Sequence, residues 1–168
     1  IDNRVQRVML AEDIRHLGSY IEIQRQRFGA RLIYRQEIVE EAMHCLVPKL
    51  LLQPIVENAI HYGANAEGEI HIFTCVAIDD GQLHIVIEDA GTGMAEETLQ
   101  HLRTMMQRGE NCSVHTGVYN IHRRIQLLFG MEYGMQIERR AEGGMRVTMV
   151  LPVTMGKGAE GDAAHSDC

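Results

Sequence analysis

The feature that most constrains the fold of this chain is an apolar strand pattern that ends in an acid and a glycine turn, Leu83 to Met94 (LHIVIEDAGTGM). Asp89 follows the apolar run, so it lies where a buried strand meets a loop, and a buried carboxylate needs a partner. An adenine ring could be that partner, because its exocyclic amine donates hydrogen bonds. Gly91 and Gly93 would let the backbone turn and approach a flat ring closely. A tight turn without a ligand would explain the same residues.

A second pattern, Leu50 to Gly63 (LLLQPIVENAIHYG), predicts an amphipathic helix with Glu57, Asn58 and His61 on or near one polar edge. Pro54 is expected in the first turn, where a missing N–H costs little. The amide oxygen of Asn58 could bind Mg²⁺, which needs only one or two protein ligands when phosphates supply the rest. His61 lies one turn further on and could touch a phosphate. A packing asparagine and a surface histidine are the alternatives.

Two further segments add to this pattern. His115 to Asn120 joins a polar stretch to a helix, and the free N–H groups of a helix N-terminus form a natural anion site. Gly143 to Pro152 predicts a turn and a core strand, in which Thr148 would face the site if its side of the strand is turned toward the nucleotide. Helix capping and a β-favouring threonine would explain these residues equally well. Together, the segments that carry Asp89 and Asn58 suggest an ATP site that is not built on a Walker-type phosphate loop.

The order of predicted elements indicates an α+β sandwich, with helices on one face of a mixed or antiparallel sheet. The first predicted elements are a helix from Val5 to Phe28 ended by Gly29, a strand over Arg31 to Val39, and a helix after Pro48 to about Tyr62. They are followed by strands over Gly68 to Ile78 and Leu83 to Glu88, joined by the turn Asp79-Asp80-Gly81, and by a helix over Ala95 to Met106. The last predicted elements are a loop over Gln107 to Thr116, a helix over Gly117 to Phe129, a hairpin of Tyr133 to Arg139 and Met145 to Pro152, and a disordered tail from Thr154 to Cys168.

Composition narrows the possible functions. The 168 residues fit one domain, and the net charge of −7 argues against a general nucleic-acid surface. The basic clusters Arg25–Arg27, Arg123–Arg124 and Arg139–Arg140 are interpreted as solvated edges. The four cysteines form no C-x-x-C pair and are expected to be reduced thiols of a cytosolic protein. No apolar run approaches the roughly 20 residues that cross a bilayer, and no signal peptide opens the chain. The chain starts mid-pattern without Met, so we expect a piece of a longer protein, with any membrane spans outside it.

These segments, in this order, resemble the ATP-binding domain shared by gyrase, heat-shock chaperone, histidine kinase and MutL proteins, which has the Bergerat-type fold. Within that group they resemble sensor histidine kinases of the LytS/YesM type. LQPIVENAIHYG resembles the asparagine box and EDAGTGM the first glycine box, while GVYNIHRRIQLLFG and GGMRVTMVLP resemble the second glycine box and the closing hairpin. Tyr20 to Phe28 resembles the segment that precedes the ATPase domain. The resemblance implies a helical end of the preceding region over residues 1–28, a catalytic domain over 29–153 and a tail over 154–168.

The resemblance also implies residue roles. Asn58 would bind Mg²⁺, with Glu57 and His61 as neighbouring catalytic candidates, and Asp89 would hold the adenine amine. The other implied nucleotide-binding residues are Gly91, Gly93 and Met94 beside the ring, Thr116, Gly117 and Val118 at the ATP lid, and Thr148 supporting Asp89 or a bridging water.

The implied function is a protein-histidine kinase, which moves the γ-phosphoryl group of ATP to a histidine and then to a response-regulator aspartate. None of the nine histidines is followed by Phe, so the acceptor helix of that family must lie upstream of Ile1. The implied partners are therefore this phosphoacceptor helix, in a homodimer, and a receiver domain, with no nucleic acid. The implied location is the cytoplasmic side of a membrane-anchored bacterial sensor kinase.

Two departures from the family pattern keep other functions open. His115 stands where the lid has its first glycine, which favours a degenerate, non-catalytic nucleotide-binding module. Pro54 stands where ATPases of this fold place a water-activating Glu, and Glu57 is turned by about 100° from Asn58. A gyrase-like ATPase is therefore disfavoured, and phosphoryl transfer to a protein side chain is favoured.

Overall fold

A computed structural model describes residues 6–108 and 116–156 of the chain. Its main feature is a five-stranded sheet in the order β2-β4-β5-β7-β6, in which β2 runs parallel to β4 and the other neighbours are antiparallel. A separate two-stranded antiparallel sheet joins β1 to β3. The strands are β1 (Arg7–Met9), β2 (Leu32–Ile38), β3 (Leu46–Pro48), β4 (Ile70–Asp79), β5 (Gln82–Asp89), β6 (Gly134–Arg139) and β7 (Met145–Pro152).

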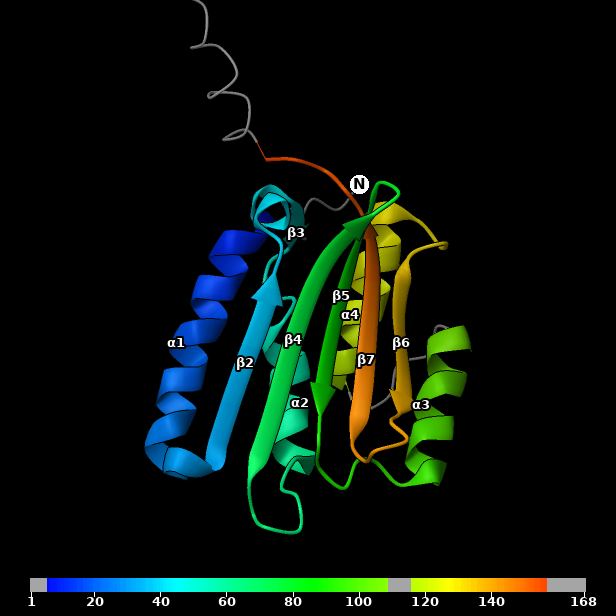
Figure 1. Cartoon of the computed structure of the whole chain (residues 1–168). Coiled ribbons are helices and arrows are strands. Elements are labelled where there is room, and N and C mark those ends of the chain that lie inside the picture. The colour runs from blue at the N-terminus through cyan, green and yellow to red at the C-terminus, as the bar shows by residue number, and fades with distance from the viewer. Residues whose placement is uncertain (1–5, 109–115, 157–168) are drawn as a thin grey trace, which may run out of the picture.

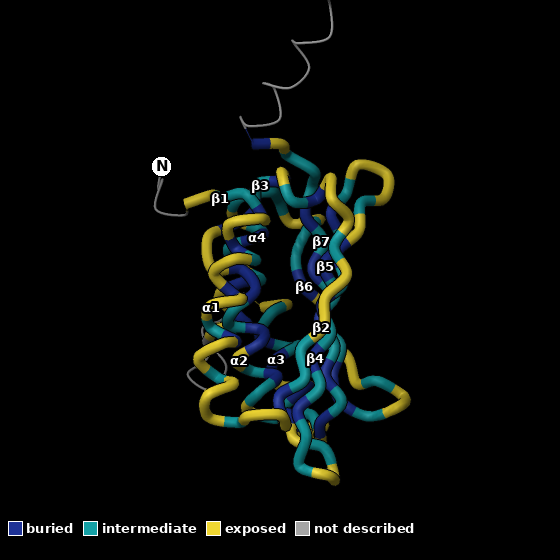
Figure 2. Tube along the Cα trace, turned by 60° about the vertical axis from the view of Figure 1, so that its left-hand side comes forward, coloured by how far each residue is buried: buried dark blue, intermediate teal, exposed yellow. Residues whose placement is uncertain are grey.

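Four α-helices cover one face of the large sheet (Figures 1 and 2). They are α1 (Leu10–Phe28), α2 (Gln53–Tyr62), α3 (Glu96–Arg108) and α4 (Thr116–Phe129), and two 3₁₀ turns cover Gly29–Arg31 and Glu40–His44. The two layers are a helical layer and a mixed, mostly antiparallel sheet. The α+β two-layer sandwich predicted from the sequence is therefore confirmed.

Alternation along the central strands fixes which side chains meet the helices. In β5 every second residue from Leu83 is buried, and Asp89 is the last of this series. The turn before β5 supports this register, because Asp80 and Gly81 both have positive φ (50° and 73°), as a two-residue type I′ hairpin requires. The same alternation that buries Ile85 and Ile87 therefore places a carboxylate on the helix-covered face.

The structure differs from the prediction at both ends of the described chain. Val8 and Met9 were predicted to be helical, but they lie in β1, whose partner β3 is about forty residues away in the sequence. Thr154 to Gly156, predicted as disordered tail, pair with the start of β3 and the residues just before it: Leu46 N–H donates to the Thr154 carbonyl (2.6 Å) and Gly156 N–H to the His44 carbonyl (2.8 Å). Both differences depend on long-range backbone pairing, which local patterns do not show.

Some expectations concern residues 1–5, 109–115 and 157–168, which lie outside the described residues. These include the assignment of Val5, the polar loop with His115, and most of the tail. In the part of the chain that the structure does describe, Cys45 and Cys75 are free thiols, and no helix is both long and apolar enough to cross a bilayer.

Candidate functional site

The site is centred on Asp89, whose side chain is only 6% exposed. Its Oδ1 accepts hydrogen bonds from the backbone N–H groups of Gly91 (3.0 Å) and Met145 (3.3 Å). Within the described residues, no hydrogen bond reaches Oδ2. Burial raises the pKa of Asp89, whereas the two N–H groups and the charge of Arg140 oppose that rise. The result is a buried carboxylate with one oxygen held by the backbone and the other available to a ligand donor.

Asn58 of α2 and Asp89 line the same cavity, although they are about thirty residues apart in the sequence. The other lining residues are mostly apolar and come from α2, β5, β6, β7 and the loop after β5: Ile55, Ala59, Tyr62, Ile87, Met94, Ile137, Met145 and Val147. Apolar walls with a few fixed polar groups are typical of sites for flat organic ligands. The carboxylate would select a ligand edge that carries an N–H donor.

The cavity is small in this structure, with a volume of about 10 Å³, which is enough for roughly one water. Met94 and Met145, which are 1% and 5% exposed, are the flexible side chains in its wall. Methionine is unbranched and adapts its shape more readily than other large apolar residues. These two thioethers are therefore the side chains that a larger ligand would displace first.

A glycine loop, Asp89 to Met94, joins β5 to the segment before α3 and rests on the C-terminal end of α2. A Cβ at Gly91 would lie 2.6 Å from the Tyr62 carbonyl oxygen and 2.7 Å from the Cα of Gly63. Thr92 Oγ1 donates to the same carbonyl at 3.3 Å. The close approach of two backbones is the reason that this position requires glycine.

Two arginines at the end of β6 hold both ends of the glycine loop. Arg140 Nη1 donates to the Asp89 carbonyl at 2.7 Å, and its Nε forms an ion pair with Glu88 at 2.7 Å. Arg139 donates to the Met94 carbonyl. The interpretation of this pair as a solvated edge is wrong for Arg140, whose side chain is 21% exposed. The turn between β6 and β7 folds back onto Asp89, which only the tertiary structure could reveal.

The structure separates some of the predicted site residues from the cavity. Glu57 is exposed and accepts a hydrogen bond from Gln53 Nε2 at 2.8 Å, and His61 is exposed with its ring edge-on to Tyr62. Neither lines the cavity with Asn58. Gly93 does lie beside it: a Cβ at this position would be 2.9 Å from the Met145 Sδ.

The residues predicted at the ATP lid begin α4. Gly117 lies next to Pro54, since a Cβ there would be 3.6 Å from the Pro54 Cβ. Val118 is buried in the core, so only its backbone can face a ligand. Thr116 is the first residue of the helix. The N-terminus of α4 therefore lies beside the first turn of the helix that carries Asn58.

Thr148 does not lie where it was predicted to support Asp89. It pairs with Val86 and belongs to the face of the sheet that the helices leave uncovered, whereas Asp89 and Val147 belong to the covered face. The residue that supports Asp89 is instead Met145, through its backbone N–H. The prediction for Thr148 was wrong because neighbouring residues of a strand face opposite sides of the sheet, and the sequence alone does not show which side faces the site.

A divalent cation could bind here only with help from a ligand. Among residues 6–108 and 116–156, no cluster of three or more His, Cys, Asp or Glu side chains could hold a metal by itself. The amide oxygen of Asn58 is a hard donor of the kind that Mg²⁺ accepts. The donor set thus fits a cation whose remaining ligands are phosphate oxygens and waters.

Comparison with known proteins agrees with this geometry. The sequence profile of the family described as histidine kinase-, DNA gyrase B- and HSP90-like ATPase matches residues 47–155, which is more than half of the chain. Sensor histidine kinase YesM of Bacillus subtilis is 38% identical over 145 residues, which are 84% of this chain and 23% of YesM. Sensor protein LytS of Bacillus anthracis is 30% identical over 155 residues, which are 89% of this chain and 26% of LytS. The chain thus spans about a quarter of the length of these relatives.

Solved structures of histidine kinases have the same fold. The nucleotide-free catalytic domain of ThkA has a TM-score of 0.65 at 17% identity, with 90% of this chain and 97% of that chain covered. The mycobacterial sensor histidine kinase MprB has a TM-score of 0.60 at 15% identity, with 90% and 99% covered. ThkA in complex with the response regulator TrrA has a TM-score of 0.63 at 18% identity, with 89% and 42% covered.

Proposed function

Since this chain belongs to the histidine kinase-, DNA gyrase B- and HSP90-like ATPase family, we propose that it is the ATP-binding catalytic domain of a sensor histidine kinase. In this proposal residues 29–153 form the catalytic domain, and residues 1–28 end the region that leads to it. The observation that carries the proposal is the cavity shared by Asp89 and Asn58, in which one buried carboxylate oxygen accepts no hydrogen bond from the residues that the structure describes.

The adenine ring lies against the glycine loop in this proposal. Its exocyclic amine donates to Oδ2 of Asp89, while Oδ1 stays bound to the N–H groups of Gly91 and Met145. Met94 and Met145 move aside and then cover the faces of the ring. A charge-assisted hydrogen bond to a buried carboxylate gives selectivity for a purine that carries an amine.

The phosphates extend toward Asn58 and the N-terminus of α4. The N–H groups of the first turn of α4, at Thr116, Gly117 and Val118, point toward an anion at this end of the helix. Asn58 holds Mg²⁺ against the phosphates, and the bound cation supplies charge neutralisation. The side chains of Glu57 and His61 are exposed and so lie outside the cavity. In this proposal they contact the acceptor segment when it approaches the phosphates.

The chemistry is transfer of the γ-phosphoryl group to a histidine upstream of Ile1, whose imidazole is itself the nucleophile, so the domain contributes positioning rather than a base. Pro54 lies in the first turn of α2 and has no side-chain base to offer, which makes a gyrase-like ATPase the less favoured function. The phosphoryl group then passes to an aspartate of a receiver domain. The acceptor helix belongs to the same protein, in a homodimer, and the parent is a membrane-anchored bacterial sensor kinase.

One observation favours a second candidate function. His115 stands where the lid of this family has its first glycine, which favours a module that binds nucleotide without catalysis. Such a module would signal through nucleotide binding alone. Supplying an acceptor helix separates the two functions, because only the kinase transfers phosphate to it.

We expect the isolated chain to bind Mg²⁺–ATP but to retain no radiolabel after incubation with γ-labelled ATP, because the acceptor histidine lies outside it. Adding the acceptor-helix fragment of the parent protein should move label onto that fragment, and base-stable, acid-labile label would identify phosphohistidine. Nucleotide binding without any transfer would support the non-catalytic module. Label on this chain itself would contradict the assignment of the acceptor.

Asn58→Ala should remove most of the gain in nucleotide affinity that Mg²⁺ provides. Loss of a metal ligand weakens the cation-dependent part of binding, and we expect a loss of about tenfold or more. Titration calorimetry of a non-hydrolysable ATP analogue, with Mg²⁺ and with EDTA, measures both parts in the same protein. Affinity in EDTA should stay near that of the unaltered chain, because Asp89 is untouched. An equal loss in both buffers would mean that Asn58 supports the fold and not the cation.

A further inference from the structure

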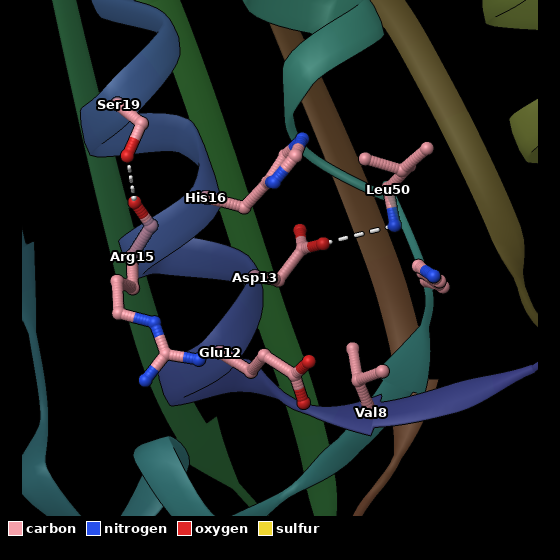
Figure 3. A pocket seen from close by; sticks show the side chains of 8 residues that line it. Val8, Glu12, Asp13, Arg15, His16, Ser19 and Leu50 are labelled. Atoms are coloured by element: carbon pink, nitrogen blue, oxygen red, sulfur yellow. Dashed lines mark hydrogen bonds between the residues drawn. The ribbon is translucent and has the colours of Figure 1, made fainter.

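A second buried carboxylate, Asp13 of α1, joins this helix to the segment that leads into α2. Asp13 is 4% exposed and accepts three backbone hydrogen bonds: Oδ1 from Leu50 (2.9 Å) and Leu51 (3.3 Å), and Oδ2 from Leu52 (3.1 Å). Figure 3 shows its carboxylate pointing from α1 toward the Leu50 nitrogen. Burial raises the pKa of Asp13, while these N–H groups and the charge of His16 oppose the rise. The carboxylate thus uses both oxygens to hold one stretch of backbone.

The backbone that receives Asp13 has an unusual conformation. Leu50 has φ 59°, in the left-handed region that residues with a branched side chain rarely adopt. A left-handed residue followed by helical ones turns successive N–H groups to one side, which creates a concave anion site. Here the anion is the Asp13 side chain. The segment keeps a strained leucine at this point, and the three hydrogen bonds to Asp13 compensate for it.

A third helix meets the same place. Arg124 of α4 donates to the carbonyl of Lys49, the residue before the strained leucine. Burial lowers the pKa of Arg124, and the charge of Asp13 raises it, so the two groups lie close enough to interact. Asp13 therefore lies where α1, the start of α2 and α4 come together. In the proposed function, α1 precedes the catalytic region, α2 carries the cation ligand Asn58, and α4 has the N-terminus that faces the phosphates.

We propose that Asp13 is a positioning residue for the nucleotide site, because its carboxylate fixes the first turn of α2 and thereby the direction in which Asn58 points. α2 has only ten residues, and a helix of that length is marginal without tertiary support. A carboxylate at its N-terminal end also complements the helix dipole. Since Asp13 belongs to α1, a displacement of α1 acts on Asn58 through these bonds. The proposal rests on the proposed function of Asn58.

The test compares Asp13→Asn with Glu12→Gln in the full chain. Asparagine keeps one acceptor oxygen but places an NH₂ donor against a backbone N–H, whereas Glu12 is an exposed acid one residue away that serves as the matched control. We expect Asp13→Asn to lower the Mg²⁺-dependent gain in affinity for a non-hydrolysable ATP analogue about tenfold. Its affinity in EDTA should change less than about twofold, because Asp89 belongs to β5 and not to α2. Glu12→Gln should change neither.

Equal losses with and without Mg²⁺, or no loss at all, would overturn the proposal. Absence of nucleotide binding by the unaltered chain would instead refute the proposed function, and hydrogen exchange then decides this inference without a ligand. Asp13→Asn should speed exchange across α2 (Gln53–Tyr62) at least about tenfold more than Glu12→Gln does. Unchanged exchange in α2 overturns the proposal.

A variant that does not fold still leaves a measurement on the unaltered protein. The amides of Leu50, Leu51 and Leu52 precede the regular helix, so they would exchange rapidly without a partner. NMR-detected exchange should find them protected as strongly as the amides inside α2, because Asp13 accepts all three. Exchange at the rate of an open loop contradicts the proposed anchoring.

Discussion

Asp89→Asn is expected to weaken ADP binding by about a hundredfold or more while leaving the fold intact. Oδ2 of Asp89 is the acceptor that we propose for the adenine amine, and asparagine in the same orientation presents an NH₂ group there, so two donors would face each other. Loss of a charge-assisted hydrogen bond that leaves a buried donor unpaired has a cost of this size. Titration calorimetry measures the affinity directly. Asp79→Asn, an exposed acid at the far end of the same hairpin, is the matched control and should bind normally.

The same variant makes a separate prediction about stability. Burial holds the pKa of Asp89 above the unfolded value of 3.8, so the folded state loses stability as pH rises from 3.8 through the raised pKa. Asparagine removes that loss and keeps its Oδ1 for the N–H groups of Gly91 and Met145. We therefore expect the thermal midpoint of Asp89→Asn at pH 7 to equal or exceed that of the unaltered chain. A variant that binds ADP normally would refute the adenine site, and one that unfolds would mean that Asp89 is structural.

Gly91→Ala is expected to destabilise the domain by about 1–3 kcal/mol, because its Cβ would enter the space of the α2 backbone. The new carbon would lie 2.6 Å from the Tyr62 carbonyl oxygen and 2.7 Å from the Gly63 Cα, and neither atom can turn away as a side chain can. Urea unfolding followed by circular dichroism gives the free energy of unfolding. Separating the glycine loop from α2 would also move Asp89 relative to Asn58, so nucleotide affinity should fall with stability.

Gly18→Ala provides the matched control for this substitution. Gly18 lies within α1, and a Cβ there would meet nothing within 4 Å. Alanine is the better helix former, so the control should gain up to about 1 kcal/mol. A Gly91→Ala protein as stable as the unaltered chain would show that the glycine loop is free to move away from α2.

The sequence predicted the parts of the site that depend on local pattern. Asp89 ends an alternating strand, and Asn58 lies in an apolar helix, so both could be located without a structure. Glu57 and His61 share that helix, but their exposure depends on how the helix is turned against the sheet. Thr148 was misplaced for a related reason: the strand was recognised, but the face that carries the site was not.

Arg140 and Asp13 show what no local pattern could supply. Each contacts backbone far away in the sequence, Asp89 in one case and Leu50 to Leu52 in the other. A charged residue in a polar stretch or on an amphipathic helix has the same local signature whether it is solvated or buried against a distant N–H or C=O group. The burial of these two side chains is therefore a property of the packed chain.

By itself, the sequence determined most of the helices and the strands of the large sheet, the two-layer class of the fold, and the acid and amide that are candidates for the site. It could do so because hydrophobic periodicity and turn chemistry act over a few residues. Only the tertiary structure decided which faces meet, which carboxylate oxygen is left for a ligand, and that Asp13 anchors the helix of Asn58. Those outcomes depend on strand register and on contacts between distant segments, whose energies arise only when the whole core is packed.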